Sequence, residues 1–278
     1  MCNVLNYKIM DGAMGTMILA QGIPINSCLE GLNRTHPSLI SKIHKKYLKA
    51  GAEMIVANTF GANRPRLTYW KKQNQINTLN QSGVRIAKKA AGERKVLASI
   101  GPLGPHAQRM SSLEMRKHFR EQVRALEEEK PYGYLIETMT SLKEALSAIQ
   151  AVRQVSDRPA FVLLAGSKKF WQTGKSLNKV ALSLRKSGAD VLGFNCGTKL
   201  SEVYDLMKAL SQMDPGPWCV RPSAGLPGKI KTPKQFATWG LKFKSLGCQW
   251  IGGCCGTTPE HIQSLRKNFP YLPGNPRS

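Results

Sequence analysis

Acidic residues are scarce in this sequence, and their scarcity gives the chain an unusual charge. Asp and Glu total 17 against 41 Lys and Arg, which makes a formal net charge of +24 over 278 residues. Such an excess disfavours basic partners and favours acidic ones, such as nucleic acid, an anionic surface or an acidic protein. The basic residues are scattered along helical stretches, however, so the alternative is a solvated basic surface without a chemical role.

Long apolar runs are missing as well. No stretch approaches the roughly 20 apolar residues of a membrane-spanning helix, and the first residues lack the apolar centre of a signal peptide. We therefore expect a cytoplasmic protein with no membrane partner.

The cysteine count is odd, which argues against a disulfide framework. Seven cysteines occur in a long chain in which we recognise no export signal. In that setting metal ligands or free thiols are more common than disulfides. Four of the seven have no chemical neighbours in the sequence and are expected to act as small hydrophobic residues: Cys2, Cys28, Cys219 and Cys248.

What the sequence does contain is a regular alternation of strand-like and helix-like segments. Eight short apolar runs are separated by stretches with apolar residues at helical spacing. The runs lie at 8–13, 52–58, 96–101, 132–137, 160–165, 190–195, 218–223 and 249–254. Strand and helix alternating eight times predicts a closed parallel (β/α)8 TIM barrel, and the length fits a single domain over 1–278.

The connections between these segments carry further signals. Gly51, Gly188 and Gly247 each stand between a helix-like stretch and the next strand. A glycine there can adopt the left-handed conformation that ends a helix. The polar and basic segment 62–80 is expected to be a long loop with some helix near the barrel mouth.

Polar residues gather at the carboxyl ends of the predicted strands, which is where the active site of such a barrel lies. They are Asp11, Asn58, Glu137, Asn195, Cys196, Ser223, Cys254 and Cys255. We therefore take these strand ends as the candidate active site.

Cys196, Cys254 and Cys255 can converge, because barrel strands lean around a common mouth. Neighbouring residues of a regular strand point to opposite faces, so the adjacent pair needs irregular backbone, which the surrounding glycines can supply. A zinc site with three protein ligands keeps one position open for chemistry, and three thiolates suit the activation of a substrate thiol. The alternatives are three unrelated buried cysteines, or a closed structural site with a fourth ligand.

The segment around the adjacent cysteines also carries a resemblance. Gly-Gly-Cys-Cys-Gly-Thr-Thr-Pro-Glu-His-Ile at 252–262 resembles the C-terminal signature of the homocysteine S-methyltransferase family. That family includes the homocysteine-binding module of cobalamin-dependent methionine synthase and betaine–homocysteine methyltransferase. Further matches follow in the family's order over nearly the whole chain, at 10–16, 57–62, 136–138, 193–196 and 224–227.

The resemblance implies a zinc-dependent methyltransferase that moves a methyl group to the thiolate of homocysteine, giving methionine. Carried over by position, Cys196, Cys254 and Cys255 would be the Zn²⁺ ligands. Asp11 and Glu137 match the family carboxylates that receive the amino group of homocysteine. An ammonium in a partly dry pocket does need a carboxylate partner. A turn aspartate and a rim salt bridge are the alternatives for these two residues.

The sequence departs from the family pattern after the seventh strand. Relatives usually have Asn where this chain has Ser223, and this leaves the fourth zinc ligand open. After the fifth strand, Lys168 and Lys169 stand where relatives often carry acidic residues. Gly256 follows the cysteine pair, whereas the S-methylmethionine-using branch tends to have Arg there.

The methyl donor is left open between two classes: a methylated corrinoid (cobalamin) on a separate protein, and a small methyl-sulfonium or methyl-ammonium compound. One alternative function keeps the chemistry and methylates another small thiol. The other is a non-catalytic basic barrel that binds nucleic acid or an acidic partner. The intact cysteine triad makes nucleic acid the less expected partner.

Overall fold

The computed structural model describes residues 7–168, 171, 175–197, 199–225 and 228–269. Its strands are β1 (Lys8–Ile9), β2 (Met54–Val56), β3 (Lys95–Ile100), β4 (Gly133–Met139), β5 (Ala160–Ala165), β6 (Val191–Cys196), β7 (Trp218–Pro222) and β8 (Trp250–Ile251). They form one eight-stranded sheet in the order β1-β8-β7-β6-β5-β4-β3-β2, and every pair is parallel. A parallel bridge between Met10 and Met54 closes the ends of this order. The predicted (β/α)8 barrel is thereby confirmed.

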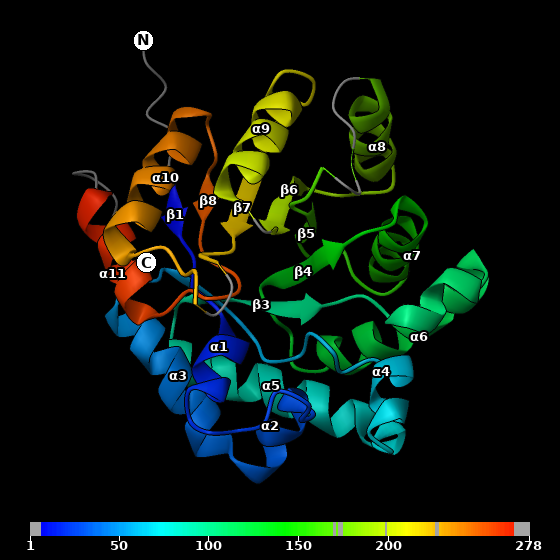
Figure 1. Cartoon of the computed structure of the whole chain (residues 1–278). Helices are drawn as coiled ribbons and strands as arrows, with labels where there is room; N and C mark the ends of the chain where they lie inside the picture. The colour runs from blue at the N-terminus through cyan, green and yellow to red at the C-terminus, as the bar shows by residue number, and fades with distance from the viewer. Residues whose placement is uncertain (1–6, 169–170, 172–174, 198, 226–227, 270–278) are drawn as a thin grey trace.

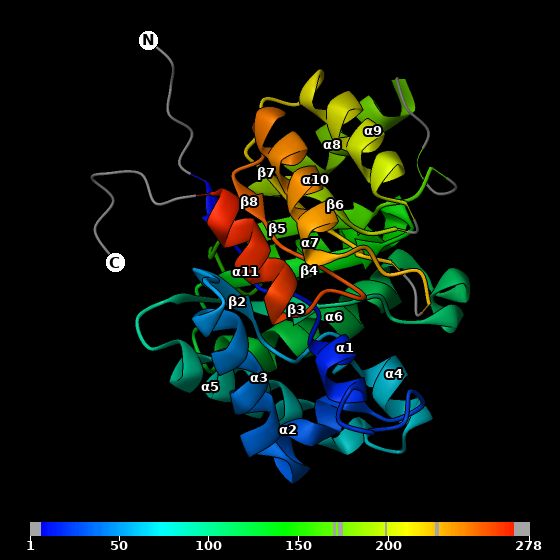
Figure 2. The same cartoon turned by 60° about the vertical axis from the view of Figure 1, so that its left-hand side comes forward.

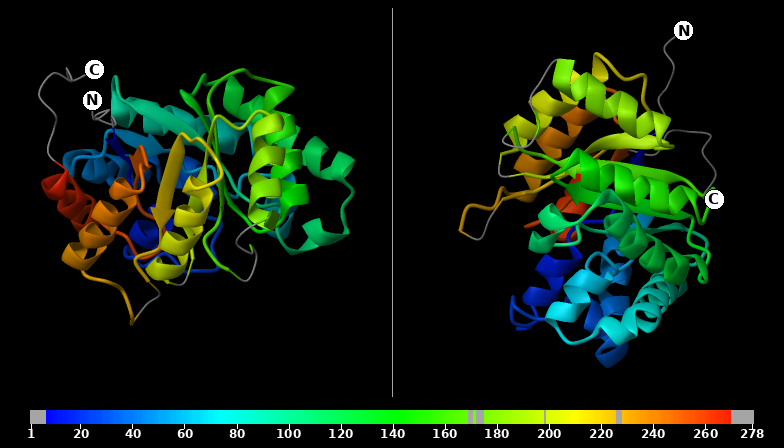
Figure 3. Two further views of the ribbon diagram at one scale, coloured as in Figure 1. Left: turned by 90° about the horizontal axis from the view of Figure 1, so that it is seen from above. Right: turned by 90° about the vertical axis from the view of Figure 1, so that its right-hand side faces the viewer.

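A helix follows each strand and packs on the outside of the barrel (Figure 1). In chain order these helices are α3 (Pro37–Lys49), α5 (Ile76–Ala91), α6 (Ser112–Glu127), α7 (Leu142–Arg153), α8 (Lys175–Lys186), α9 (Leu200–Ser211), α10 (Pro233–Ser245) and α11 (Pro259–Asn268). Each contacts the next, and α11 returns to contact α3. Figure 2 shows α10 and α11 side by side, and both views of Figure 3 show the helices outside the strands.

The first two connections are longer than the others and carry extra elements. Between β1 and α3 lie α1 (Met14–Leu19), η1 (Leu29–Gly31) and α2 (Leu32–Thr35). Between β2 and α5 lie α4 (Arg64–Tyr69) and η2 (Gln73–Gln75), and η3 (Pro105–Arg109) precedes α6. The segment 62–80 is therefore more helical than the long loop that we expected, because α4, η2 and the first turn of α5 occupy most of it.

The core has two parts, which follow from the alternation of side chains along each strand. Met10, Leu97, Leu135, Phe161 and Cys219 belong to an apolar cluster that fills the barrel interior. The intervening strand residues face the helices and form the larger cluster. On α3 the apolar residues at helical spacing, Ile40, Ile43 and Tyr47, are buried against the barrel.

The turns after three helices follow the expectation drawn from their glycines. Gly51, Gly188 and Gly247 have φ angles of 103°, 101° and 95°. These values lie in the left-handed region, which costs glycine less than any other residue. Among the described helices, none combines the length and the apolar composition needed to cross a bilayer.

Candidate functional site

A cavity of about 250 Å³ lies at the carboxyl ends of the strands. Residues from both ends of the chain line it, because the barrel brings β1 beside β8. Among the lining residues are Glu137, Cys196, Arg221, Cys254 and Cys255. Four of the five residues proposed from the sequence as ligands or substrate contacts therefore face one space; the fifth, Asp11, is described below.

The three cysteines converge as predicted. Cys196 is the last residue of β6, and Cys254 and Cys255 follow β8. The Sγ atoms of Cys196 and Cys255 are 3.9 Å apart, as are those of Cys254 and Cys255, and all three lie within 4.8 Å of one another. Tetrahedral Zn²⁺ with Zn–S bonds of 2.3 Å separates its sulfur ligands by about 3.8 Å. The triad thus fits the metal, and Cys255 leaves it open to solvent on one side.

Unusual backbone brings the three thiols together. Cys196 has a φ of 58°, a left-handed value that costs a non-glycine residue on the order of 1 kcal/mol or more. β8 ends at Ile251, so the adjacent pair lies on irregular chain, as the sequence predicted. Gly256 has a φ of 77°, and a Cβ on Gly253 would lie 2.5 Å from the Thr257 side chain. Larger residues at these two positions would displace the cysteines.

The loop that carries Cys254 and Cys255 is tied down by hydrogen bonds. The Thr257 hydroxyl donates to the Cys254 carbonyl at 2.6 Å, and the Ser223 hydroxyl donates to the Cys255 carbonyl at 2.9 Å. The Ser223 Oγ also accepts from the Gly225 amide at 3.1 Å. Ser223 stands where relatives usually have Asn. Its hydroxyl is hydrogen-bonded to backbone groups and holds the loop that carries Cys254 and Cys255 in place.

The thiols of the triad share negative charge. Hydrogen bonds from Cys196 and Cys254 lower the pKa of Cys255 to about 3. Hydrogen bonds with Cys196 and Cys255, together with burial, raise the pKa of Cys254 well above its ordinary value. Two of the three sulfurs therefore hold their protons, because three thiolates at this spacing would repel one another. A bound cation would relieve that repulsion.

Glu137 lies in the wall of the same cavity and is 8% exposed. Its carboxylate accepts from the Ser99 hydroxyl at 2.6 Å and from the Asn195 amide at 3.2 Å. Burial raises its pKa, and the charge of Arg221 opposes that rise. The pairing of β4 with β5 shifts register between Ile136 and Met139, so Glu137 sits in a bulge, a device that re-aims side chains near active sites.

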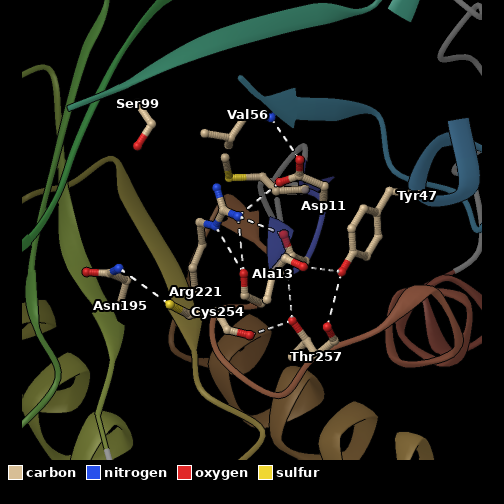
Figure 4. A network of polar contacts seen from close by, with 12 residues as sticks. Asp11, Ala13, Tyr47, Val56, Ser99, Asn195, Arg221, Cys254 and Thr257 are labelled. Atoms are coloured by element: carbon tan, nitrogen blue, oxygen red, sulfur yellow. Dashed lines mark hydrogen bonds and ion pairs between the residues drawn. The ribbon is translucent and has the colours of Figure 1, made fainter. Parts of the chain in front are cut away.

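Asp11 lies directly after β1 and is 2% exposed. One of its oxygens accepts from the Val56 amide at 2.8 Å, and the other from Nη2 of Arg221 at 3.0 Å (Figure 4). Burial raises the pKa of Asp11 to about 6, against the opposing charge of Arg221. The side chain is not among those that line the cavity. Its contact with a substrate amino group stays a prediction.

Arg221 and Ser99 were missed in the sequence analysis, and Asn195 was named there only as a strand-end residue, yet all three surround the predicted carboxylates. Arg221 and Ser99 each lie two residues beyond a member of the interior cluster (Cys219 and Leu97), and Asn195 lies four residues beyond another, Val191. The alternation along strands 96–101, 190–195 and 218–223 was the signal that could have found them. Asn58, another strand-end residue, donates to the Leu29 carbonyl at 2.9 Å and thereby ties down a loop.

A second hollow lies outside the barrel, between α3 and α5, and has a volume of about 750 Å³. Its cationic lining residues are Lys42, Lys45, Lys46, Lys49, Arg85 and Lys89. Part of the excess positive charge is therefore gathered on an outer helical face.

Of the two lysines that follow the fifth strand, Lys168 forms an ion pair with Asp205 at 2.8 Å. Lys169 lies outside the described residues.

Comparisons with known proteins give the family of this chain. The model of the family described as homocysteine S-methyltransferase matches residues 8–269. The methionine synthases of Mycobacterium tuberculosis (strain ATCC 25618 / H37Rv) and Mycobacterium leprae (strain TN) are each 29% identical to this chain, over 95% and 92% of its length. The chain spans about a quarter of these curated relatives, 25% and 24% of their lengths.

Among solved structures, the metallated form of the homocysteine methyltransferase MmuM from Escherichia coli is similar, with a TM-score of 0.83 and 23% identity. The match covers 96% of this chain and 97% of that one, and shows that the two share a fold. The apo form of the same protein gives a TM-score of 0.76. Since the family model covers nearly all of the sequence, the chain belongs to the homocysteine S-methyltransferase family.

Proposed function

We propose that this enzyme transfers a methyl group to the thiol of homocysteine and forms methionine, with Zn²⁺ as its metal. The observation that carries the proposal is the meeting of three cysteine thiols and a buried carboxylate in one cavity at the barrel mouth. In the transfer, the acceptor sulfur forms a bond to the methyl carbon while the bond from that carbon to the donor breaks. The bonding electrons stay with the donor.

Cys196, Cys254 and Cys255 would hold the zinc. Their sulfur spacing supports this assignment, as does the metallated form in which the similar MmuM protein was solved. A free thiol with a pKa of about 8.5 is only a few per cent ionised at neutral pH, and zinc would keep the acceptor thiol deprotonated there. The exposed side of Cys255 leaves room for that thiol to approach.

Glu137 and Asp11 would bind the amino group of homocysteine. Glu137 lines the cavity and is held in place by Ser99 and Asn195. A carboxylate offers about four lone-pair sites. Asp11 therefore retains acceptor capacity beyond its bonds to Val56 and Arg221.

The donor would be a methylated corrinoid carried on a separate protein. Gly256 supports this choice over a small sulfonium compound, since the branch that uses S-methylmethionine tends to have Arg at that position. The likeness to two methionine synthases supports it too. A small methyl-sulfonium or methyl-ammonium compound is the competing donor class.

A donor screen tests this function. Zinc-loaded protein is incubated with homocysteine and, in separate reactions, with a methylcorrinoid protein, free methylcobalamin, S-methylmethionine or betaine, and methionine is measured. The proposal expects methionine in the presence of at least one donor and the fastest formation with the corrinoid protein. Methylation of a different thiol, with homocysteine left unchanged under every donor, would replace the acceptor with that thiol.

A further inference from the structure

The hollow between α3 and α5 carries positive charge that is mostly without ion-pair partners. Six cationic side chains line it, and none of its described lining residues is acidic. Arg85 forms an ion pair with Glu129. The other five cations form no ion pair with any described carboxylate: Lys42, Lys45, Lys46, Lys49 and Lys89.

The spacing of these cations places like charges beside one another. The four lysines of α3 stand at positions i, i+3, i+4 and i+7, which share one face of a helix. Arg85 and Lys89 are four residues apart on α5, which packs against α3 (Figure 2). Like charges four residues apart destabilise a helix. The arrangement therefore works against the stability of the fold, and an anion bound in the hollow would relieve the repulsion.

The ends of the two helices account for only part of this charge. Lys46, Lys49 and Lys89 lie in the last turns of α3 and α5, where the helix dipole favours cations. The pKa of Glu260 is lowered by its hydrogen bond with Thr258 and, to a smaller extent, by the charge of Lys46. Neither reason applies to Lys42 and Lys45, which are exposed and precede the last turn.

The hollow is separate from the cavity that holds the cysteines, and no residue lines both. Its cations lie from the middle of α3 to its end and in the second half of α5. Helices of this barrel run opposite to the strands, so these parts lie towards the amino ends of the strands. The cysteines lie at the carboxyl ends. A ligand in the hollow would therefore leave the barrel mouth open.

The lining residues indicate which anion fits. There is no aromatic side chain among them on which a nucleic-acid base could stack, and the one arginine is engaged by Glu129. Lysine offers a compact charge that suits phosphate oxygens without reading bases. A protein partner would need apolar or aromatic anchors, whereas Pro37 and Ile86 are the apolar residues that the hollow offers.

We propose that the hollow between α3 and α5 binds the phosphate backbone of a double-stranded nucleic acid without regard to base sequence. A duplex carries one negative charge per about 1.7 Å of its axis, and lysines that contact its phosphates release condensed counterions. This binding is a second property of the chain and does not depend on methyl transfer. The cysteine triad does not argue against it, because the two sites lie at different places on the barrel.

Fluorescence anisotropy of labelled duplexes tests the proposal on the full chain. Two DNA duplexes of unrelated sequence and one RNA duplex, each of about 20 base pairs, are titrated with protein at about 50 to 200 mM salt. We expect the two DNA sequences to bind within about threefold of each other. The logarithm of the association constant should fall with the logarithm of the salt concentration with a slope of about −3 to −5, since each phosphate contact contributes about −0.9. The RNA arm shows whether A-form duplexes share the site.

Paired variants locate the binding. Lys42→Glu combined with Lys45→Glu should weaken binding at least about tenfold at 0.1 M salt and make the slope shallower by about two. Lys42→Gln combined with Lys45→Gln removes the same charges without reversing them and should change the slope alike. Lys179→Glu combined with Lys208→Glu, on α8 and α9, is the control with the matched change in net charge (Figure 1). It should bind within about threefold of the wild type. Circular dichroism verifies that each variant is folded.

Three results would overturn the proposal. A control that loses as much affinity as the hollow variants would mean that net charge alone attracts the duplex. Polyglutamate that displaces the labelled duplex better than unlabelled duplex does, at equal charge, would give the hollow to an acidic protein. Absence of binding by the wild type at the lowest salt concentration would leave the hollow without a nucleic-acid ligand.

Discussion

The side-chain amide of Asn195 donates to the carboxylate of Glu137 at 3.2 Å and so links β6 to the bulge of β4. The same amide accepts from the Thr138 backbone N–H at 2.7 Å and donates to the Thr138 hydroxyl at 2.8 Å. Thr138 has a φ of 62°, a left-handed conformation that needs such support. Asn195 thus holds the bulge in shape, and the bulge aims Glu137 into the cavity beside Cys254.

Replacing Glu137 with Gln should weaken homocysteine binding by about 1.5–3 kcal/mol, because a charge-assisted contact with the amino group is lost. Zinc should stay bound, since Glu137 is not a proposed ligand. Calorimetry of the zinc-loaded variant measures the affinity. Glu144→Gln is the matched control: Glu144 is a buried glutamate that accepts from the Leu103 amide at 2.7 Å and does not line the cavity. An unchanged affinity in Glu137→Gln would make this carboxylate structural.

His44 should make the fold sensitive to acid. It is fully buried on α3, and neither ring nitrogen has a partner among the described residues. Burial lowers its pKa from 6.5 to about 4. Below pH 6.5 the His44 imidazole is protonated in the unfolded chain, whereas in the folded protein it stays neutral down to about pH 4. Its contribution to stability is complete above pH 6.5 and is lost as the pH falls towards 4.

His44→Leu removes the titrating imidazole. The free energy of unfolding of this variant should therefore depend less on pH below pH 7 than that of the wild type. Relative to the wild type, its free energy of unfolding should rise by about 2 kcal/mol between pH 7 and pH 5. Urea unfolding at several pH values measures the difference. The exposed His36, replaced in the same way, is the control. A difference between variant and wild type that stays constant with pH would show that His44 is charged or solvated in the folded protein.

The fold and the meeting of the cysteines were predictable because each depends on a local pattern. Strand and helix alternate along the whole chain, and Cys196, Cys254 and Cys255 stand at strand ends that a closed barrel must bring together. Strand lengths were less predictable. β1 and β8 have two residues each, because the chain leaves the hydrogen-bonded ladder early to place Asp11 and both cysteines.

Arg221 could not be assigned a role from its surroundings in the sequence. A basic residue in an otherwise apolar strand is compatible with a solvent-facing position, with an edge or with a buried ion pair. Its partner, Asp11, lies 210 positions away in the chain. Ser99 was missed for the same reason, since its role depends on Glu137, which lies on another strand. Asn195 was named as a strand-end residue, but its hydrogen bond to Glu137 could not be predicted from the sequence.

Methyl transfer from a methylcorrinoid protein should slow steeply with added salt if an acidic carrier docks on the basic residues Lys168 and Lys169, which follow the fifth strand in the sequence. Exposed charges are screened over roughly 8–10 Å at 0.1–0.15 M salt. Lys168→Glu combined with Lys169→Glu should lower kcat/KM for the carrier protein. Free methylcobalamin should be a much poorer donor and nearly insensitive to salt.

Lys45→Glu combined with Lys46→Glu makes the same change in net charge on the outer face of α3 and is the matched control. A control that slows transfer as much as the mouth variant would mean that net charge alone guides the encounter. Rapid turnover with a small sulfonium or betaine and no corrinoid would contradict a corrinoid donor.

Zinc content, measured by mass spectrometry on the purified protein and its variants, tests the role of the three cysteines most directly. We expect about one zinc per chain in the wild type and in Cys28→Ser, whose cysteine stands apart from the triad. We expect almost none in Cys254→Ser and Cys255→Ser, with the barrel still folded by circular dichroism, because its core does not depend on the metal. A wild-type protein that forms methionine at full rate without zinc would contradict a metal-activated acceptor.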